Sequence, residues 1–212
     1  MFTTPKTLLN ALTLVIVLVS ASPALAGPPL ICHPFDTGSK TLLAWGSGSS
    51  WNTPDRSFDL KKLTAETLRA LDVDDAVLSR MENLRRATIY AMQDPAAAQS
   101  LLSTLIGRAL ATTPTARAWF DAGYVIEAYK QAVHLRGPNG RFDRAAWAAT
   151  DETLRVDGYG FVKKAMAMDG PSAEMEFAAS LMTQGAVASA HRSRANAAAA
   201  RGSFLAANLA KY

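Results

Sequence analysis

Apolar side chains recur at three- and four-residue steps along most of the chain after residue 60, which is the spacing of one face of an α-helix. The clearest case is the segment 113–135, whose apolar residues share a face: Trp119, Ala122, Ile126, Tyr129 and Val133, with Phe120 and Gly123 beside them. Thr113 and Pro114 predict its start, since threonine caps helices and proline suits the first turn. Such an aromatic stripe has to be buried against other helices.

Several further helices are expected from the same spacing and from capping residues. One runs from Thr64 to about Leu71, and Asp94-Pro95 begins another that ends near Ala111 and buries its leucines, Leu110 included. The remaining expected helices cover 142–150 with Trp147, a segment starting near Gly158, a segment after Asp169-Gly170-Pro171, and 186–209 with a break near Gly202. A turn-rich loop is expected at 136–142.

A helix starting at Asp72 or Asp74 carries many charges. Its expected inward stripe consists of Val77, Met81, Leu84, Thr88 and Met92. Its expected exposed face consists of Arg80, Arg85 and Arg86 with Asp75 and Glu82. Charged side chains are rarely buried, so we predict that this face meets solvent.

The absence of any alternating apolar and polar run predicts an all-α fold. Short connections favour antiparallel neighbours, so we expect stacked helical hairpins in a repeat-like arrangement. The segments 95–135 and 151–190 are the two clearest candidate hairpins. EAYKQAV at 127–133 resembles the second helix of a tetratricopeptide repeat, although the other consensus positions of that repeat do not follow in register.

The segment 27–59 has a different character, because prolines and glycines interrupt it throughout. We expect an irregular, extended arm with at most a short helical turn at 40–45. Trp45 and Trp51 lie within it. Two indoles in such a segment predict packing against the helical body or a partner surface.

The first 26 residues have the pattern of a secretory signal: Lys6, an apolar run at 7–20, and ASPALA before Gly27. The alternatives are a membrane anchor, for which the run is short, and a lipoprotein attached through Cys32. We therefore expect a signal peptide at 1–26, the arm at 27–59, a helical domain at 60–212, and a periplasmic or extracellular location. A single cysteine excludes an internal disulfide.

The charge is uneven near the C-terminus. No acidic residue follows Glu176, whereas Arg192, Arg194, Arg201 and Lys211 do. This basic segment is interpreted either as a solvated helix face or as a patch that binds an anionic envelope surface.

Cys32 and His33 are the most distinctive candidates for chemistry. A thiolate beside an imidazole is typical of nucleophiles and of metal or haem ligands. The competing interpretations are a packed or free thiol and an intermolecular disulfide. His134 and His191 stand apart, no metal-ligand spacing joins the histidines, and the carboxylates, Glu176 included, fall at helix starts. We therefore expect no metal, no cofactor and no catalytic constellation.

Five stretches carry a resemblance: PPLICHPFD, LRRATIYA, WFDAGYVIEAYKQ, DGYGFVKKA and EMEFAASL. Together they resemble a group of uncharacterised exported bacterial proteins, for which the resemblance implies export and a helical body but no activity. The favoured function is an exported helical binding or scaffold module, with a protein partner or a second copy and no nucleic acid. The alternatives are an enzyme or a metal or haem protein using Cys32 and His33, and a peripheral binder using the basic C-terminal helix.

Overall fold

The computed structural model describes residues 29–38, 41–48, 50–133, 135 and 155–212. Helices make up the body, and no strand occurs in these ranges. In chain order the helices are α1 (Leu63–Val73), α2 (Val77–Ala91), α3 (Pro95–Ala109), α4 (Ala116–Ala132), α7 (Gly158–Asp169), α8 (Ala173–Met182), α9 (Gly185–Ala198) and α10 (Phe204–Lys211). A 3₁₀ turn, Leu60–Lys62, precedes α1. The predicted all-α fold class is confirmed.

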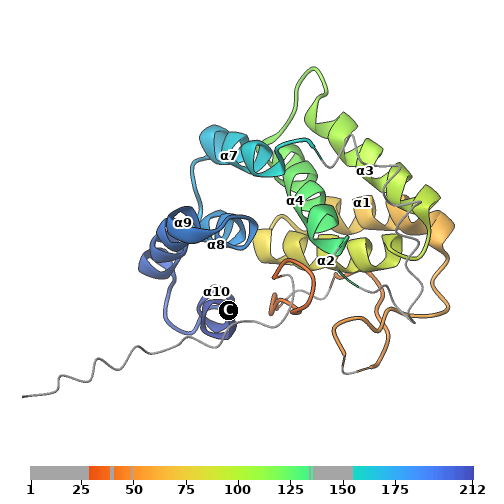
Figure 1. The fold of residues 1–212 in the computed structure, drawn as a ribbon, viewed down its shortest axis with the longest axis horizontal. Coiled ribbons are helices and arrows are strands. Elements are labelled where there is room, and N and C mark those ends of the chain that lie inside the picture. The colour runs from red at the N-terminus through yellow and green to blue at the C-terminus, as the bar shows by residue number, and fades with distance from the viewer. Residues whose placement is uncertain (1–28, 39–40, 49, 134, 136–154) are drawn as a thin grey trace, which may run out of the picture.

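Neighbouring helices pack as hairpins that stack on one another (Figure 1). Helix α1 packs on α2, α3 on α4, and α8 on α9, while α7 covers α4 and α10 lies on α8. The Tyr129 hydroxyl, near the end of α4, donates to the Ala98 carbonyl at the start of α3 over 3.2 Å. The expected antiparallel pairing of these two helices is therefore correct.

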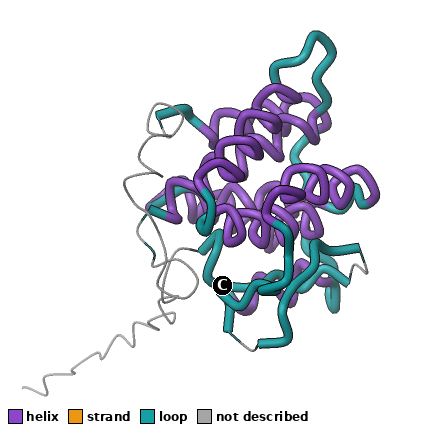
Figure 2. The backbone as a smooth tube through the Cα atoms, turned by 90° about the vertical axis from the view of Figure 1, so that its right-hand side faces the viewer, coloured by secondary structure: helices purple, strands orange, loops and turns teal. Residues whose placement is uncertain are grey.

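Helix α2 lies at the centre, between α1, α3, α4 and α8. Every one of its residues except Arg86 is buried. The predicted solvent face was therefore wrong for Arg80, Glu82 and Arg85, which are at most 3% exposed, whereas Asp75, just before the helix, is exposed as predicted. For Glu82 and Arg85 the reason is the N-terminal arm, the described part of residues 29–59, whose loops run along the helical body (Figure 2) and bond to these two side chains.

Buried Arg80 is satisfied within the helical body. Its Nε and Nη2 each donate over 2.8 Å to the carboxylate of Asp121 on α4. Its Nη1 donates to the carbonyl oxygens of Leu71 and Asp74 at the end of α1. One guanidinium thus ties α1, α2 and α4 together, in the two-bond geometry that makes arginine–carboxylate pairs strong.

Helix starts follow the capping chemistry of the sequence in most cases. Asp94 accepts from the amides of Ala96 and Ala97 with Pro95 in the first turn, as predicted. Helix α7 starts at Gly158, and Gly202 (φ 74°) stands between α9 and α10, as expected. The cap of α4 is Thr115 rather than Thr113.

Other local expectations need correction. Thr64 lies inside α1, and Asp59 caps the 3₁₀ turn before it. Residues 41–45 form no helical turn, and Leu110 is exposed beyond the end of α3. The expected signal peptide, the loop at 136–142, the helix at 142–150 and His134 lie outside the described residues.

Helices α4 and α7 approach unusually closely at a pair of glycines. A methyl group on Gly123 would lie 2.5 Å from the Gly158 carbonyl oxygen and 2.9 Å from Cγ2 of Val162. Both distances are below normal contact, so the two backbones can meet here only because position 123 has no side chain.

We predict that Gly123→Ala lowers the free energy of unfolding by about 1–3 kcal/mol, since the added carbon forces α4 and α7 apart. The matched control is Gly107→Ala in α3, where a methyl group meets no atom within 4 Å. That change should stabilise the protein by about 0.5–1 kcal/mol through helix propensity. Urea denaturation measures both, and an unchanged or higher stability for Gly123→Ala would contradict the close approach.

Candidate functional site

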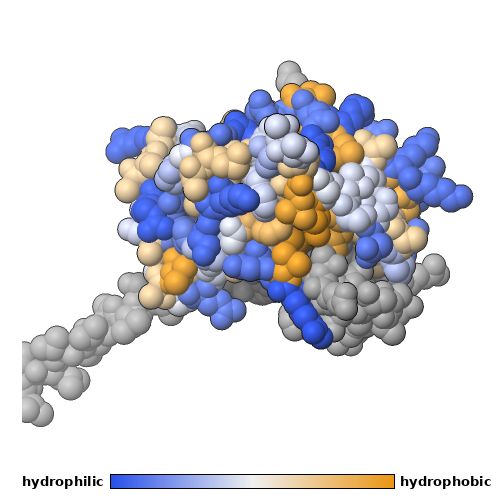
Figure 3. All heavy atoms as spheres, turned by 90° about the horizontal axis from the view of Figure 1, so that it is seen from above, coloured by the Kyte–Doolittle hydropathy of each residue, from blue (hydrophilic) through white to orange (hydrophobic). Residues whose placement is uncertain are grey.

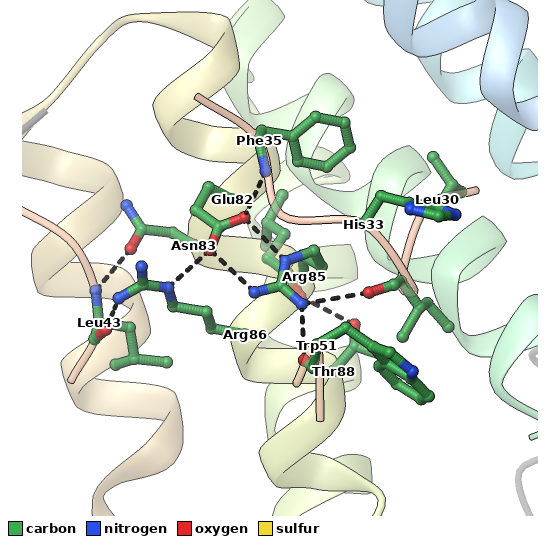
Figure 4. Close-up of polar contacts among 12 residues, drawn as sticks. Leu30, His33, Phe35, Leu43, Trp51, Glu82, Asn83, Arg85, Arg86 and Thr88 are labelled. Carbon is green, nitrogen blue, oxygen red and sulfur yellow. Dashed lines mark hydrogen bonds and ion pairs between the residues drawn. The ribbon is translucent and has the colours of Figure 1, made fainter. Parts of the chain in front are cut away.

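The arm contains no helix or strand in its described residues, so its main-chain N–H and C=O groups need partners from elsewhere. Side chains of α2 supply several of them (Figure 4). The Phe35 amide donates to Glu82 Oε2 over 3.0 Å, and the Leu43 amide donates to Asn83 Oδ1 over 2.7 Å. Carboxylate and amide side chains of α2 thus take the role that a neighbouring strand has in a sheet.

Two arginines of α2 hold arm carbonyl groups. Arg85 Nη1 lies 3.1 Å from the carbonyl oxygens of both Ile31 and Trp51. Arg86 Nη1 donates to the Leu43 carbonyl over 2.6 Å. Adjacent residues of one helix therefore hold three separate stretches of the arm.

Glu82 pairs with both arginines. Its two carboxylate oxygens accept from Arg85 over 2.7 and 2.9 Å, and one of them also accepts from Arg86 over 2.7 Å. Burial raises the pKa of the Glu82 carboxyl, but the hydrogen bonds and charges of Arg85 and Arg86 outweigh burial and hold that pKa below its ordinary value. The group is therefore ionised at neutral pH.

The arm folded in this way forms an open hollow of about 490 Å³, which we call the arm hollow. It is lined by residues from two stretches of the arm: Trp45, Gly46, Ser47 and Gly48 from one, and Thr53, Pro54, Asp55 and Arg56 from the other. A space of this size is in the range that binds small molecules. All of its lining residues belong to the arm, and side chains of α2 contact both stretches of the arm that form it.

Tyr90 of α2 joins the two walls of the arm hollow. Its hydroxyl donates to the Ala44 carbonyl over 2.7 Å and accepts from the Asp55 amide over 3.0 Å. The Phe58 ring stacks on the Tyr90 ring with centroids 4.3 Å apart. One phenol from the helical core therefore fixes the spacing between the walls.

The indole of Trp45 is held by three side chains of α2. Its ring meets Tyr90 edge-on at 5.8 Å between centroids. The guanidinium carbons of Arg85 and Arg86 lie 5.0 and 5.5 Å from the centre of the indole, within the range of cation–π attraction. The aromatic wall of the hollow is thus oriented before any ligand arrives.

The other lining groups are polar and nearly neutral in sum. Asp55 and Arg56 carry opposite charges, and Ser47 and Thr53 contribute hydroxyl groups. Hydrogen bonds from the Ser57 hydroxyl and amide to Asp55 Oδ1 hold the pKa of that carboxyl below its ordinary value. The hollow therefore combines one aromatic surface with hydrogen-bonding groups and no excess charge.

Cys32 and His33 do not line the arm hollow. Burial raises the pKa of the Cys32 thiol to about 11, with the charge of Arg85 opposing part of the rise. The His33 ring packs edge-on against Tyr212, 5.3 Å between centroids. A buried, protonated thiol is a poor nucleophile and a poor metal ligand, which argues against chemistry at this pair.

The three arginines of the predicted basic patch have different surroundings. Arg192 donates to the Leu209 carbonyl over 2.7 Å, which fastens α9 to α10. Arg194 Nε pairs with Glu176 over 2.9 Å, and Arg201 is exposed. Two of the three cations are thus engaged within the molecule.

Sequence reasoning missed a cluster around His191, which we had expected to stand apart. Its Nδ1 lies 2.5 Å from Glu176 on α8, and its Nε2 lies 2.6 Å from the Tyr159 hydroxyl on α7. Burial raises the pKa of Glu176, but Arg194 and His191 outweigh burial and hold that pKa below its ordinary value. Arg194 Nη2 also lies 2.7 Å from Nδ1, so the carboxylate of Glu176 and the guanidinium of Arg194 both meet this nitrogen.

The His191 cluster ties three helices together. The imidazole and the carboxylate are both buried, at 5% and 6% exposure, and only the tyrosine is partly open to solvent. The imidazole nitrogens and the carboxylate oxygens lie between α7, α8 and α9. Their hydrogen bonds therefore stabilise the packing of these three helices. Nothing in the local sequence signals it, since Tyr159, Glu176 and His191 are widely spaced along the chain.

The described residues contain neither a cluster of metal-ligating side chains nor a helix able to span a membrane. No three histidine, cysteine or acidic side chains gather there in a way that would hold a metal ion. No helix in that part of the chain is both long and apolar enough to cross a membrane. Comparison with protein-family models, with curated proteins and with solved structures gives no match.

The depressed pKa values of Glu82 and Glu176 predict acid-sensitive stability. Each carboxyl releases its proton more readily in the folded chain than in the unfolded chain, so its contribution is complete above the ordinary value of 4.5. That contribution is lost as pH falls through the lower folded-state pKa. Urea denaturation should show stability declining steeply below about pH 4.5.

Glu82→Gln should lower stability at pH 7 by about 3–5 kcal/mol, because two arginines lose their buried counter-charge, and should flatten the acid decline. The control is Glu66→Gln in α1, which removes the exposed pair with Arg69 and should change stability by at most about 1 kcal/mol. An acid decline as steep in Glu82→Gln as in the natural chain would show that Glu82 is not responsible.

Proposed function

We propose that the protein is an exported, all-helical binding module, and that the arm hollow binds a neutral sugar or short oligosaccharide. The observation that carries the proposal is the oriented indole of Trp45 in a hollow of about 490 Å³ with polar, charge-balanced walls. Export rests on the signal pattern of residues 1–26 and is tested by N-terminal sequencing of the secreted protein.

The chemistry of the lining favours this ligand class. The apolar face of a sugar ring stacks on an aromatic side chain, and its hydroxyl groups need both donors and acceptors. Asp55 supplies an acceptor, Arg56 a donor and Ser47 a group that does either, while the Thr53 hydroxyl, which donates to the Ser50 carbonyl, supplies an acceptor. A strongly charged ligand would find no opposing excess of charge among these lining residues.

The way the arm is held also supports binding. Buried ion pairs add little net stability compared with apolar packing, because desolvating the charges offsets their attraction. Here the Glu82–Arg85–Arg86 group holds arm carbonyls and the Trp45 ring in one place. A pre-formed site avoids the entropy that a flexible loop would lose on binding a ligand.

The proposal is tested by titrating the chain from Gly27 onward with glucose-based and N-acetylglucosamine-based oligosaccharides. Calorimetry and tryptophan fluorescence provide two independent readouts. We expect Trp45→Ala to weaken binding tenfold or more, about 1.4 kcal/mol, and Trp45→Phe to weaken it less because a ring remains for stacking.

Trp51→Phe is the control, since Trp51 does not line the hollow. It should bind with the affinity of the natural chain, and circular dichroism should show that all variants stay folded. If neither saccharide series binds, or if Trp45→Ala binds as well as Trp51→Phe, the proposal fails.

A further inference from the structure

A second surface of the molecule exposes apolar side chains that the described residues do not cover. Among the described residues, Val73, Leu110 and Met168 are 63%, 61% and 47% exposed. They stand at the end of α1, just after α3 and near the end of α7. The connection between α3 and α4 is at the top of Figure 1, and Figure 3 shows from that side how apolar residues interrupt the polar surface.

These ends surround another hollow, of about 470 Å³. The carboxyl ends of α1, α3 and α7 meet the amino ends of α2 and α4 there. The lining consists of Leu71, Asp72, Asp75, Arg80, Arg108, Thr115, Ala116, Arg117, Met168 and Asp169. We call this hollow, together with Val73 and Leu110, the helix-end face.

Charges of both signs alternate across the helix-end face. Arg108 pairs with Asp72 over 2.7 Å, and Arg117 pairs with Asp169 and lies 3.8 Å from Asp75. The side chains of these five residues are between 36% and 86% exposed, so none is committed to the interior. Exposed ion pairs of this kind are weak and exchange partners readily.

From these observations we infer that the helix-end face binds the same face of a second copy of the chain about a two-fold axis. A two-fold contact requires a surface that is complementary to itself. Here the arginines of one copy can oppose the aspartates of the other, while the apolar residues of both copies leave water together. Interfaces are rich in methionine and arginine at their centres, and both occur on this face.

The charge pattern argues against other occupants. The lining carries three arginines and three aspartates, so it offers no excess of positive charge to a nucleic acid or an anionic membrane, even though the whole chain carries a net charge of +4. A strongly acidic or strongly basic protein would leave one set of charges on this face opposed by its own sign. A second copy satisfies both sets equally.

Sedimentation velocity and light scattering on the chain from Gly27 onward test the inference. We expect a mass twice that of one chain, and a single-chain mass for Leu110→Asp and for Met168→Asp, with unchanged circular dichroism. Val187→Asp is the matched control, because Val187 is 48% exposed on α9 and lies away from this face; it should remain a dimer.

Charge exchange between copies gives a second, independent test. Arg117→Asp alone makes the face acidic and Asp169→Arg alone makes it basic, so each variant should sediment as a single chain. Mixed in equal amounts, the two variants should form a dimer containing one of each. A single-chain mass for the natural protein at the highest concentration reached would overturn the inference, as would failure of the mixed pair. Neither outcome bears on sugar binding at the arm hollow.

Discussion

The structure depends on a buried carboxylate that holds two arginines beneath a segment with no secondary structure of its own. Glu82 pairs with both Arg85 and Arg86, and the remaining donors of these arginines take up carbonyl groups of the arm. An extended segment packed on a helix would otherwise bury unpaired main-chain groups, each at a cost of about 1–3 kcal/mol. The polar side chains of Glu82, Asn83, Arg85 and Arg86 thus allow the described part of the arm, which forms no strand, to cover α2.

This arrangement also gives the arm hollow a fixed shape, which the proposed binding site requires. Loops usually owe their shape to their own turns and are the more mobile parts of a fold. Here Tyr90 spans both walls of the arm hollow from the helical core, and the guanidinium groups of α2 lie against Trp45. The position of the indole is therefore determined by the helix that forms the centre of the fold.

Much of the helical body could be predicted from the sequence, because its signals are local. The stripe of α4, the Asp94-Pro95 start and the break near Gly202 each depend on residues a few positions apart. The burial of Arg85 could not be predicted, since its partner Ile31 lies 54 residues away. The pairing of His191 with Glu176 on another helix was missed for the same reason, and the Trp45 segment was recognised only as an irregular, packed arm.

Hydrogen exchange at two arm amides tests the central claim most directly. The amides of Phe35 and Leu43 donate to Glu82 and Asn83, so each should exchange as slowly as the amides in the middle of α2 and open with them. That result would show that the arm and α2 form one cooperative unit. Exchange at the rate of exposed loop amides, with α2 still protected, would show instead that the arm is only loosely attached.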